Sequence, residues 1–184
     1  TTALAAAETA QLLLAASADP GGPLGLIGPP GPVANAVLDL LTGRGCSVQV
    51  VSAKPPRPLV RRAEQINAAG YGTVSFVPDA EAVLEAGHPL VAASSTGGRL
   101  QRSALPGGVV IDVAAPQDVV LDGSPRADLT ILDGEYVRLP APLGGSGWQQ
   151  LYRWITHQGR AVFGCFAEPM VLALAGRPDL ATVG

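Results

Sequence analysis

The chain has few of the residues that build metal centres and disulfide frameworks. Its 184 residues include only two cysteines, Cys46 and Cys165, and two histidines. Two cysteines do not make a disulfide framework, and no secretory signal precedes them, so a reducing, cytoplasmic compartment fits best. The cysteines and histidines also lack the spacing typical of metal ligands. We therefore predict no metal site.

Long apolar runs and clusters of positive charge are missing as well. No apolar stretch reaches the roughly 18 residues that a membrane-spanning helix needs. The formal net charge is −3, with 12 basic and 15 acidic residues. No run of Lys or Arg forms a footprint for nucleic acid. We expect neither a transmembrane segment nor a nucleic-acid partner.

What the chain does have is a regular alternation of short apolar runs and helix-compatible segments. Strands are predicted at 24–28, 47–52, 73–77, 90–93, 109–113 and 129–132, and helices at 2–16, 32–42, 59–69, 80–86, 148–155 and 161–175. This alternation predicts an α/β fold that is Rossmann-like and doubly wound. Its sheet is expected to be mainly parallel and six-stranded, with helices on both faces.

The length suits one domain with a full core, and we predict a single NAD(P)-binding domain over residues 1–184. The chain starts at Thr1 inside an apparent helix and stops at Gly184, so we expect it to be part of a longer polypeptide. The Pro/Gly-rich stretch Pro140 to Gly147 is the predicted hinge or boundary. It precedes a helical C-terminal part, 148–184, that carries Cys165.

A glycine-rich turn follows the first predicted strand and opens a helix, in the pattern Gly28-x-x-Gly31-x-x-Ala34. Such glycines allow a tight turn and close approach of the backbone to a pyrophosphate, with the helix N-terminus facing the anion. The βαβ context favours a dinucleotide loop over an ordinary βα turn. Prolines at positions 29, 30 and 32 lack N–H groups, so Gly31, Val33 and Ala34 are the predicted donors.

The ends of three other predicted strands carry polar side chains. After the second strand come Ser52, Lys54 and Arg57, where an NAD-specific fold usually has an acidic residue. A hydroxyl and two cations suit a 2′-phosphate, so NADPH is the predicted cofactor, although a solvated basic turn has the same composition. Ser94, after the fourth strand, either borders a ligand crevice or belongs to a plain loop. Asp112, at the C-terminal end of the fifth, is interpreted as a helix or turn cap.

Cys165 is predicted to open an apolar helix. A thiol at a helix N-terminus feels the positive end of the helix dipole, which favours the thiolate that attacks carbonyl carbon. Glu168 lies one turn further on, where it either steers a proton or simply suits the first turn. The alternative for Cys165 is a small buried hydrophobic residue, as most free cysteines are. A dinucleotide loop plus a poised cysteine indicates reduction of a thioester through an acyl-cysteine.

The block at 163–168, Phe-Gly-Cys-Phe-Ala-Glu, is the most specific part of a wider similarity that includes 2–8, 28–31, 110–112 and 133–137. In these stretches the chain resembles the NADPH-dependent long-chain fatty acyl-[acyl-carrier-protein] reductases, which make fatty aldehydes. The resemblance implies that Cys165 accepts the acyl group. It also implies that the loop with Gly28, Gly31 and Ala34 binds NADPH, and that the substrate is an acyl thioester on an acyl-carrier protein.

The chain departs from this family in its glycine loop. Ala34 stands where the family has a third glycine, and the family's loop is not filled with proline. The family also has a further N-terminal domain that this chain lacks. A diverged relative that acts on a different carrier-bound acyl group, or a domain of a biosynthetic megasynthase, fits these departures.

Two other functions stay open on the sequence. One is a dehydrogenase of the shikimate or glutamyl-tRNA reductase type, which uses the same fold without an acyl-cysteine. The other is a non-catalytic Rossmann module that binds a partner or a nucleotide. Trapping of an acyl-enzyme separates the reductase from the dehydrogenase, and titration with NADPH tests the non-catalytic alternative.

Overall fold

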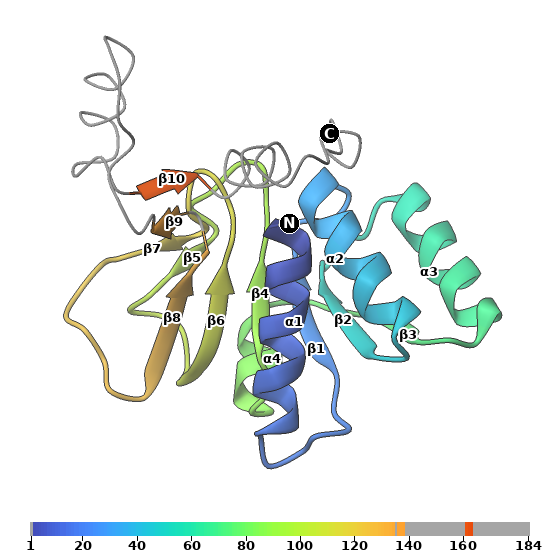
Figure 1. Cartoon of the computed structure of the whole chain (residues 1–184), viewed down its shortest axis with the longest axis horizontal. Helices are drawn as coiled ribbons and strands as arrows, with labels where there is room; N and C mark the ends of the chain where they lie inside the picture. The colour runs from blue at the N-terminus through green and yellow to red at the C-terminus, as the bar shows by residue number, and fades with distance from the viewer. Residues whose placement is uncertain (1, 135, 139–160, 164–184) are drawn as a thin grey trace, which may run out of the picture. The chain divides into compact units, whose positions relative to one another are not determined.

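The computed structural model describes residues 2–134, 136–138 and 161–163 (Figure 1). The chain divides into two compact units, Thr2–Asp133 and, together with Thr1, Gly134–Gly184. The predicted boundary at 140–147 lies outside the described residues. So do Cys165, Glu168 and almost all of the predicted C-terminal helical part.

The first unit is built on a six-stranded parallel sheet with the order β3-β2-β1-β4-β6-β8. Its strands are β1 (Leu24–Ile27), β2 (Ser47–Val51), β3 (Thr73–Val77), β4 (Leu90–Ala92), β6 (Gly108–Asp112) and β8 (Leu129–Asp133). Numbered within the sheet, this is the 3-2-1-4-5-6 order of the Rossmann fold. All six predicted strands are present, with ends within one residue of the prediction. The predicted fold class is confirmed.

Helices cover both faces of this sheet. The helices α1 (Thr2–Ala15), α2 (Pro32–Gly43) and α3 (Arg57–Ala69) share one core with alternate strand residues such as Leu26 and Val50. The short α4 (Glu81–Glu85) packs on the other face against Leu90 and Ala92. Figure 1 shows α1 in front of the sheet and α4 behind it. Period-two alternation in the strands therefore supplies two separate apolar layers.

A glycine in β1 makes room for α4. A Cβ added at Gly25 would lie only 2.5 Å from Val83 Cγ1 and 2.8 Å from Leu90 Cδ1. Further along the sheet, the α4 side of β2 and β3 carries partly buried or exposed polar side chains: Ser47, Gln49, Thr73 and Ser75. Alternation of polar and apolar residues is typical of a strand with one solvated face, and β3 shows that pattern in its sequence.

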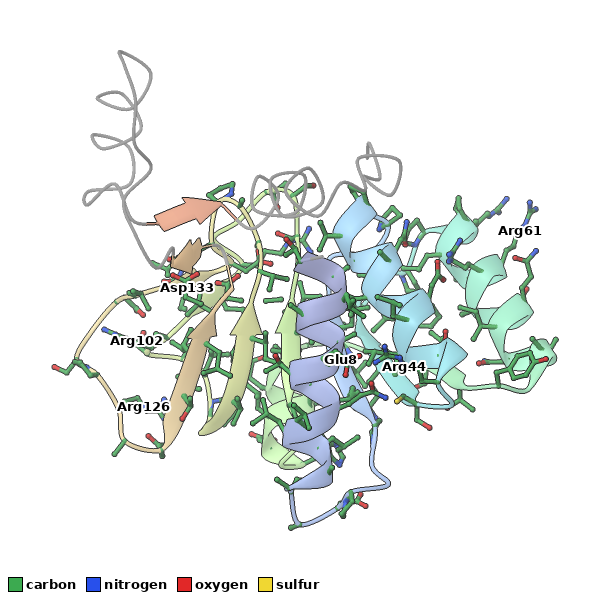
Figure 2. All side chains as sticks on the ribbon, in the orientation of Figure 1. Glu8, Arg44, Arg61, Arg102, Arg126 and Asp133 are labelled. Carbon is green, nitrogen blue, oxygen red and sulfur yellow. The ribbon has the colours of Figure 1, made fainter. Side chains whose placement is uncertain are left out.

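The connections from β4 to β6 and from β6 to β8 contain no helix. They hold instead a two-stranded parallel pair, β5 (Leu100–Gln101) and β7 (Val119–Val120), which the sequence analysis did not predict. Two arginines tie the loops around this pair: Arg102 donates to the carbonyls of Asp122 and Gly123, and Arg126 donates to that of Leu105. Both arginines lie in this part of the unit in Figure 2.

The described part of the second unit is an antiparallel pair, β9 (Tyr136–Arg138) with β10 (Ala161–Phe163). The prediction of a helix beginning at Ala161 is therefore wrong over these three residues. Val162 and Phe163 have high strand propensity, and pairing with β9 satisfies their backbone groups, which a local periodicity argument does not see.

An ion pair and two hydrogen bonds fasten α1 to the end of α2. Arg44 Nη2 lies 2.6 Å from Glu8 Oε1, and Arg44 Nη1 donates to Gln11 Oε1 at 2.6 Å. Figure 2 shows Glu8 and Arg44 meeting between the two helices. Gln11 Nε2 in turn lies 3.2 Å from the sulfur of Cys46, which packs against the core. The contacts of Cys46 are therefore those of a residue that packs the core.

Candidate functional site

The glycine loop, residues 28–31, leaves β1 beside β4, where the strand order of the sheet reverses. Gly28 has φ +121°, and the Gly31 N–H donates to the Gly28 carbonyl at 2.9 Å. The Pro29–Pro30 peptide is cis, and Asn35 Nδ2 in α2 donates to the Pro30 carbonyl at 2.9 Å. Crevices at such reversal points are where open α/β sheets bind ligands.

Gly28 lies directly on the backbone that follows β4. A Cβ at this position would sit 2.4 Å from the Ala93 carbonyl oxygen and 2.9 Å from the Ser94 nitrogen. At Gly31 the atom nearest to an added Cβ would be the Gly28 oxygen, at 3.2 Å. Ala34 is fully buried and packs α2 onto the sheet, as predicted for the third position of the motif. Close approach therefore requires glycine at position 28 in particular.

The backbone donors of the loop are fewer than the sequence predicted. The Gly31 N–H is occupied by its bond to Gly28. Val33 and Ala34 stand in the first turn of α2, where N–H groups have no carbonyl partner within the helix. These two amides and the positive end of the helix dipole are what the loop offers to an anion.

The end of β2 presents hydroxyl and cationic groups. Ser52 is half-buried, and its N–H donates to the Val77 carbonyl at 2.8 Å, which fixes this edge to β3. Lys54 and Arg57 are exposed, and neither side chain has an ion pair or hydrogen bond to the described part of the chain. Arg61, one turn after Arg57, adds an exposed cation on the outer side of α3 (Figure 2). Sequence reasoning missed Arg61, although its spacing of four residues from Arg57 was the available signal.

Ser94 is buried, at 5% exposure, and its polar groups are engaged within the protein. Its hydroxyl donates to Asp118 Oδ1, and its N–H donates to Asp118 Oδ2 at 2.9 Å. The Ser94 hydroxyl oxygen in turn accepts the Gly97 N–H at 3.2 Å. Ser94 thus supports the loop after β4, and its direct contact with a cofactor stays a prediction.

Two carboxylates are buried in this region: Asp112, the last residue of β6, at 1% exposure, and Asp118, in the loop after β6, at 0%. Asp112 accepts the N–H groups of Ala114 at 3.1 Å and Val119 at 2.8 Å, which confirms its interpretation as a turn cap. Burial raises the pKa of the Asp112 carboxyl above 3.8, and these N–H bonds oppose the rise. Sequence reasoning missed Asp118, because nothing local distinguishes it from a solvated loop aspartate.

Among the residues that the structure describes, no helix is long and apolar enough to cross a membrane. The same residues contain no group of three or more His, Cys, Asp and Glu side chains that is placed to hold a metal ion.

No known protein-family profile matches the chain. The chain is similar to the aminotransferase PigE of Serratia sp. (strain ATCC 39006), with 31% identity over 166 residues. The aligned region covers 88% of this chain but 19% of that protein, so the chain spans about a fifth of the relative it matches. The name of PigE identifies that protein as an enzyme.

Proposed function

We propose that this chain is the dinucleotide-binding part of an NADPH-dependent reductase, which converts a carrier-bound acyl thioester to an aldehyde through an acyl-cysteine on Cys165. The observation that carries the proposal is the contact of Gly28 with the Ala93–Ser94 peptide at the reversal point of a 3-2-1-4-5-6 sheet. A strand, a glycine packed closely against neighbouring backbone and a helix N-terminus follow one another there, as is typical of dinucleotide binding.

The residues around the glycine loop fit NADPH. The N–H groups of Val33 and Ala34 would face the pyrophosphate, and Ser52, Lys54 and Arg57 would hold the 2′-phosphate. Residues 52–57 include no Asp or Glu, so no carboxylate repels that phosphate. When bound, NADPH supplies a hydride.

The thioester chemistry is assigned to Cys165. Its thiolate attacks the carbonyl carbon of the acyl thioester, and the carrier thiolate leaves. After reduction the enzyme-bound carbon is a hemithioacetal, which collapses to release the aldehyde and return the cysteine sulfur. Glu168 is proposed to steer the proton. The resemblance of the 163–168 block to acyl-carrier-protein reductases supports this assignment.

The name of PigE is compatible with an aldehyde as the product. An aminotransferase transfers an amino group to a carbonyl carbon, and an aldehyde is such a carbonyl compound. This chain matches a region of about a fifth of PigE. A reductase in that region would produce one such carbonyl compound.

The proposal is tested by intact-protein mass spectrometry of the complete polypeptide after incubation with an acyl thioester and without NADPH. We expect an acyl adduct that Cys165→Ser abolishes and that Cys46→Ser, a control at the other cysteine, retains. An adduct that persists in Cys165→Ser would assign the chemistry to another residue. NADPH binding with no adduct in the wild type would instead favour a dehydrogenase without an acyl-cysteine.

A further inference from the structure

Three loops at the carboxyl edge of the sheet rest on one another. The glycine loop packs on the Ala93–Ser94 peptide, because a Cβ added at Gly28 would lie only 2.4 Å from the Ala93 oxygen. The loop after β4 lies in turn on the loop after β6. At Gly97 an added Cβ would come 2.7 Å from the Pro116 oxygen, and the Gly98 N–H donates to the Gln117 carbonyl at 2.8 Å.

Asp118 holds the middle layer of this stack through both of its oxygens. One accepts the Ser94 N–H and the other accepts the Ser94 hydroxyl. The Ser94 N–H belongs to the same peptide whose carbonyl, from Ala93, touches Gly28. The Ala93–Ser94 peptide is therefore in contact with Gly28 on one side and is hydrogen-bonded to the buried Asp118 carboxylate on the other.

We infer that Asp118 is a positioning residue for dinucleotide binding. It fixes the plane of the Ala93–Ser94 peptide, and that plane sets the seat of Gly28 and the direction of the first amides of α2. This inference rests on the proposed function, because it assumes that the glycine loop receives the pyrophosphate. Asp118 itself is fully buried, so it acts through Ser94.

The chain contains a second pair with the same chemistry, which serves as a matched control. Asp122 accepts the Ser103 N–H at 2.9 Å with one oxygen and the Ser103 hydroxyl with the other. Ser103 is exposed and Asp122 is half-buried, and the two residues follow β5 and β7 in the chain. Asp118→Ala and Asp122→Ala each remove two hydrogen bonds between an aspartate and a serine. Only the Asp118 pair involves the Ala93–Ser94 peptide that contacts Gly28.

The experiment measures the affinities of NADPH and of adenosine 2′-monophosphate, which carries the 2′-phosphate but no pyrophosphate. Asp118→Ala is expected to weaken NADPH binding about tenfold and to leave adenosine 2′-monophosphate within about twofold of the wild type. Asp118→Asn keeps one acceptor for the Ser94 N–H and should lose less. Asp122→Ala should change neither affinity. Leu105→Ala removes a buried apolar side chain from the same compact unit and shows how far a loss of stability alone lowers the two affinities.

The possible results separate the inference from the proposed function. Wild-type protein that binds no NADPH overturns both. Wild-type binding that both Asp118 variants retain overturns the inference and leaves the proposed function standing. Equal loss of both ligands in Asp118→Ala, Asp118→Asn and Leu105→Ala would mean that Asp118 acts only on stability, which also overturns it. If Asp118→Ala does not fold, as judged by circular dichroism, Asp118→Asn decides alone.

Discussion

Replacing Gly28 with alanine probes the contact on which the site depends. The new methyl group would lie 2.4 Å from the Ala93 oxygen and 2.6 Å from the Ala93 carbonyl carbon, both of them backbone atoms that cannot rotate away. The φ angle of +121° is also one that alanine rarely adopts. We expect a strain of about 1–3 kcal/mol from the backbone conformation and about 1–3 kcal/mol from overpacking, so roughly 2–6 kcal/mol in all.

Gly70→Ala is the matched control for this prediction. Gly70 also has a positive φ, +75°, at the end of α3, but a Cβ there meets no atom within 4 Å. It should therefore cost only the left-handed conformation, about 1–2 kcal/mol. Urea unfolding followed by circular dichroism measures both variants. If Gly28→Ala loses no more stability than Gly70→Ala, the close contact between the glycine loop and the end of β4 is refuted.

The remaining predictions concern the cofactor phosphates and a buried carboxylate. Replacing both Lys54 and Arg57 with Ala should weaken NADPH binding by about 1 kcal/mol per charge, because both side chains are exposed, and should leave NADH binding unchanged in the same fluorescence titration. Replacing Pro29 with Ala and Pro30 with Thr restores two N–H groups and should tighten or preserve NADPH affinity; a loss would show that the prolines hold a productive loop. The raised pKa of Asp112 means that the folded protein binds this proton more tightly than the unfolded chain. Its contribution to stability therefore falls as pH rises from 3.8 through the folded pKa, and urea unfolding across that range should show the trend in the wild type but not in Asp112→Asn.

The sheet could be predicted because each of its strands is a short apolar run that local sequence patterns identify. Short apolar runs such as Leu24–Ile27 and Leu90–Ala92 each follow a proline, and the helices between the first four strands of the sheet favour a parallel arrangement. The pair β5 and β7 escaped prediction because two residues carry no periodicity. β10 was misread because Ala161–Phe163 pairs with a segment more than twenty residues away.

The site was predictable in its composition but not in its hydrogen bonds. The motif identified the glycine loop, yet only the structure shows that the Gly31 N–H is used inside the turn. Likewise, the position of Ser94 after a strand suggested a ligand contact, whereas its hydroxyl is bound to Asp118. Such pairings depend on residues that are distant in sequence, and residue type and spacing do not encode them.

Titration of the protein with NADPH and with NADH, followed by nicotinamide fluorescence, tests the central claim most directly. The arrangement of Gly28, the first amides of α2, and the cations Lys54 and Arg57 predicts that NADPH binds and that NADH binds about tenfold more weakly or worse. Absence of NADPH binding would contradict a dinucleotide site at this edge of the sheet. Equal affinity for both cofactors would contradict the assignment of Lys54 and Arg57 to the 2′-phosphate.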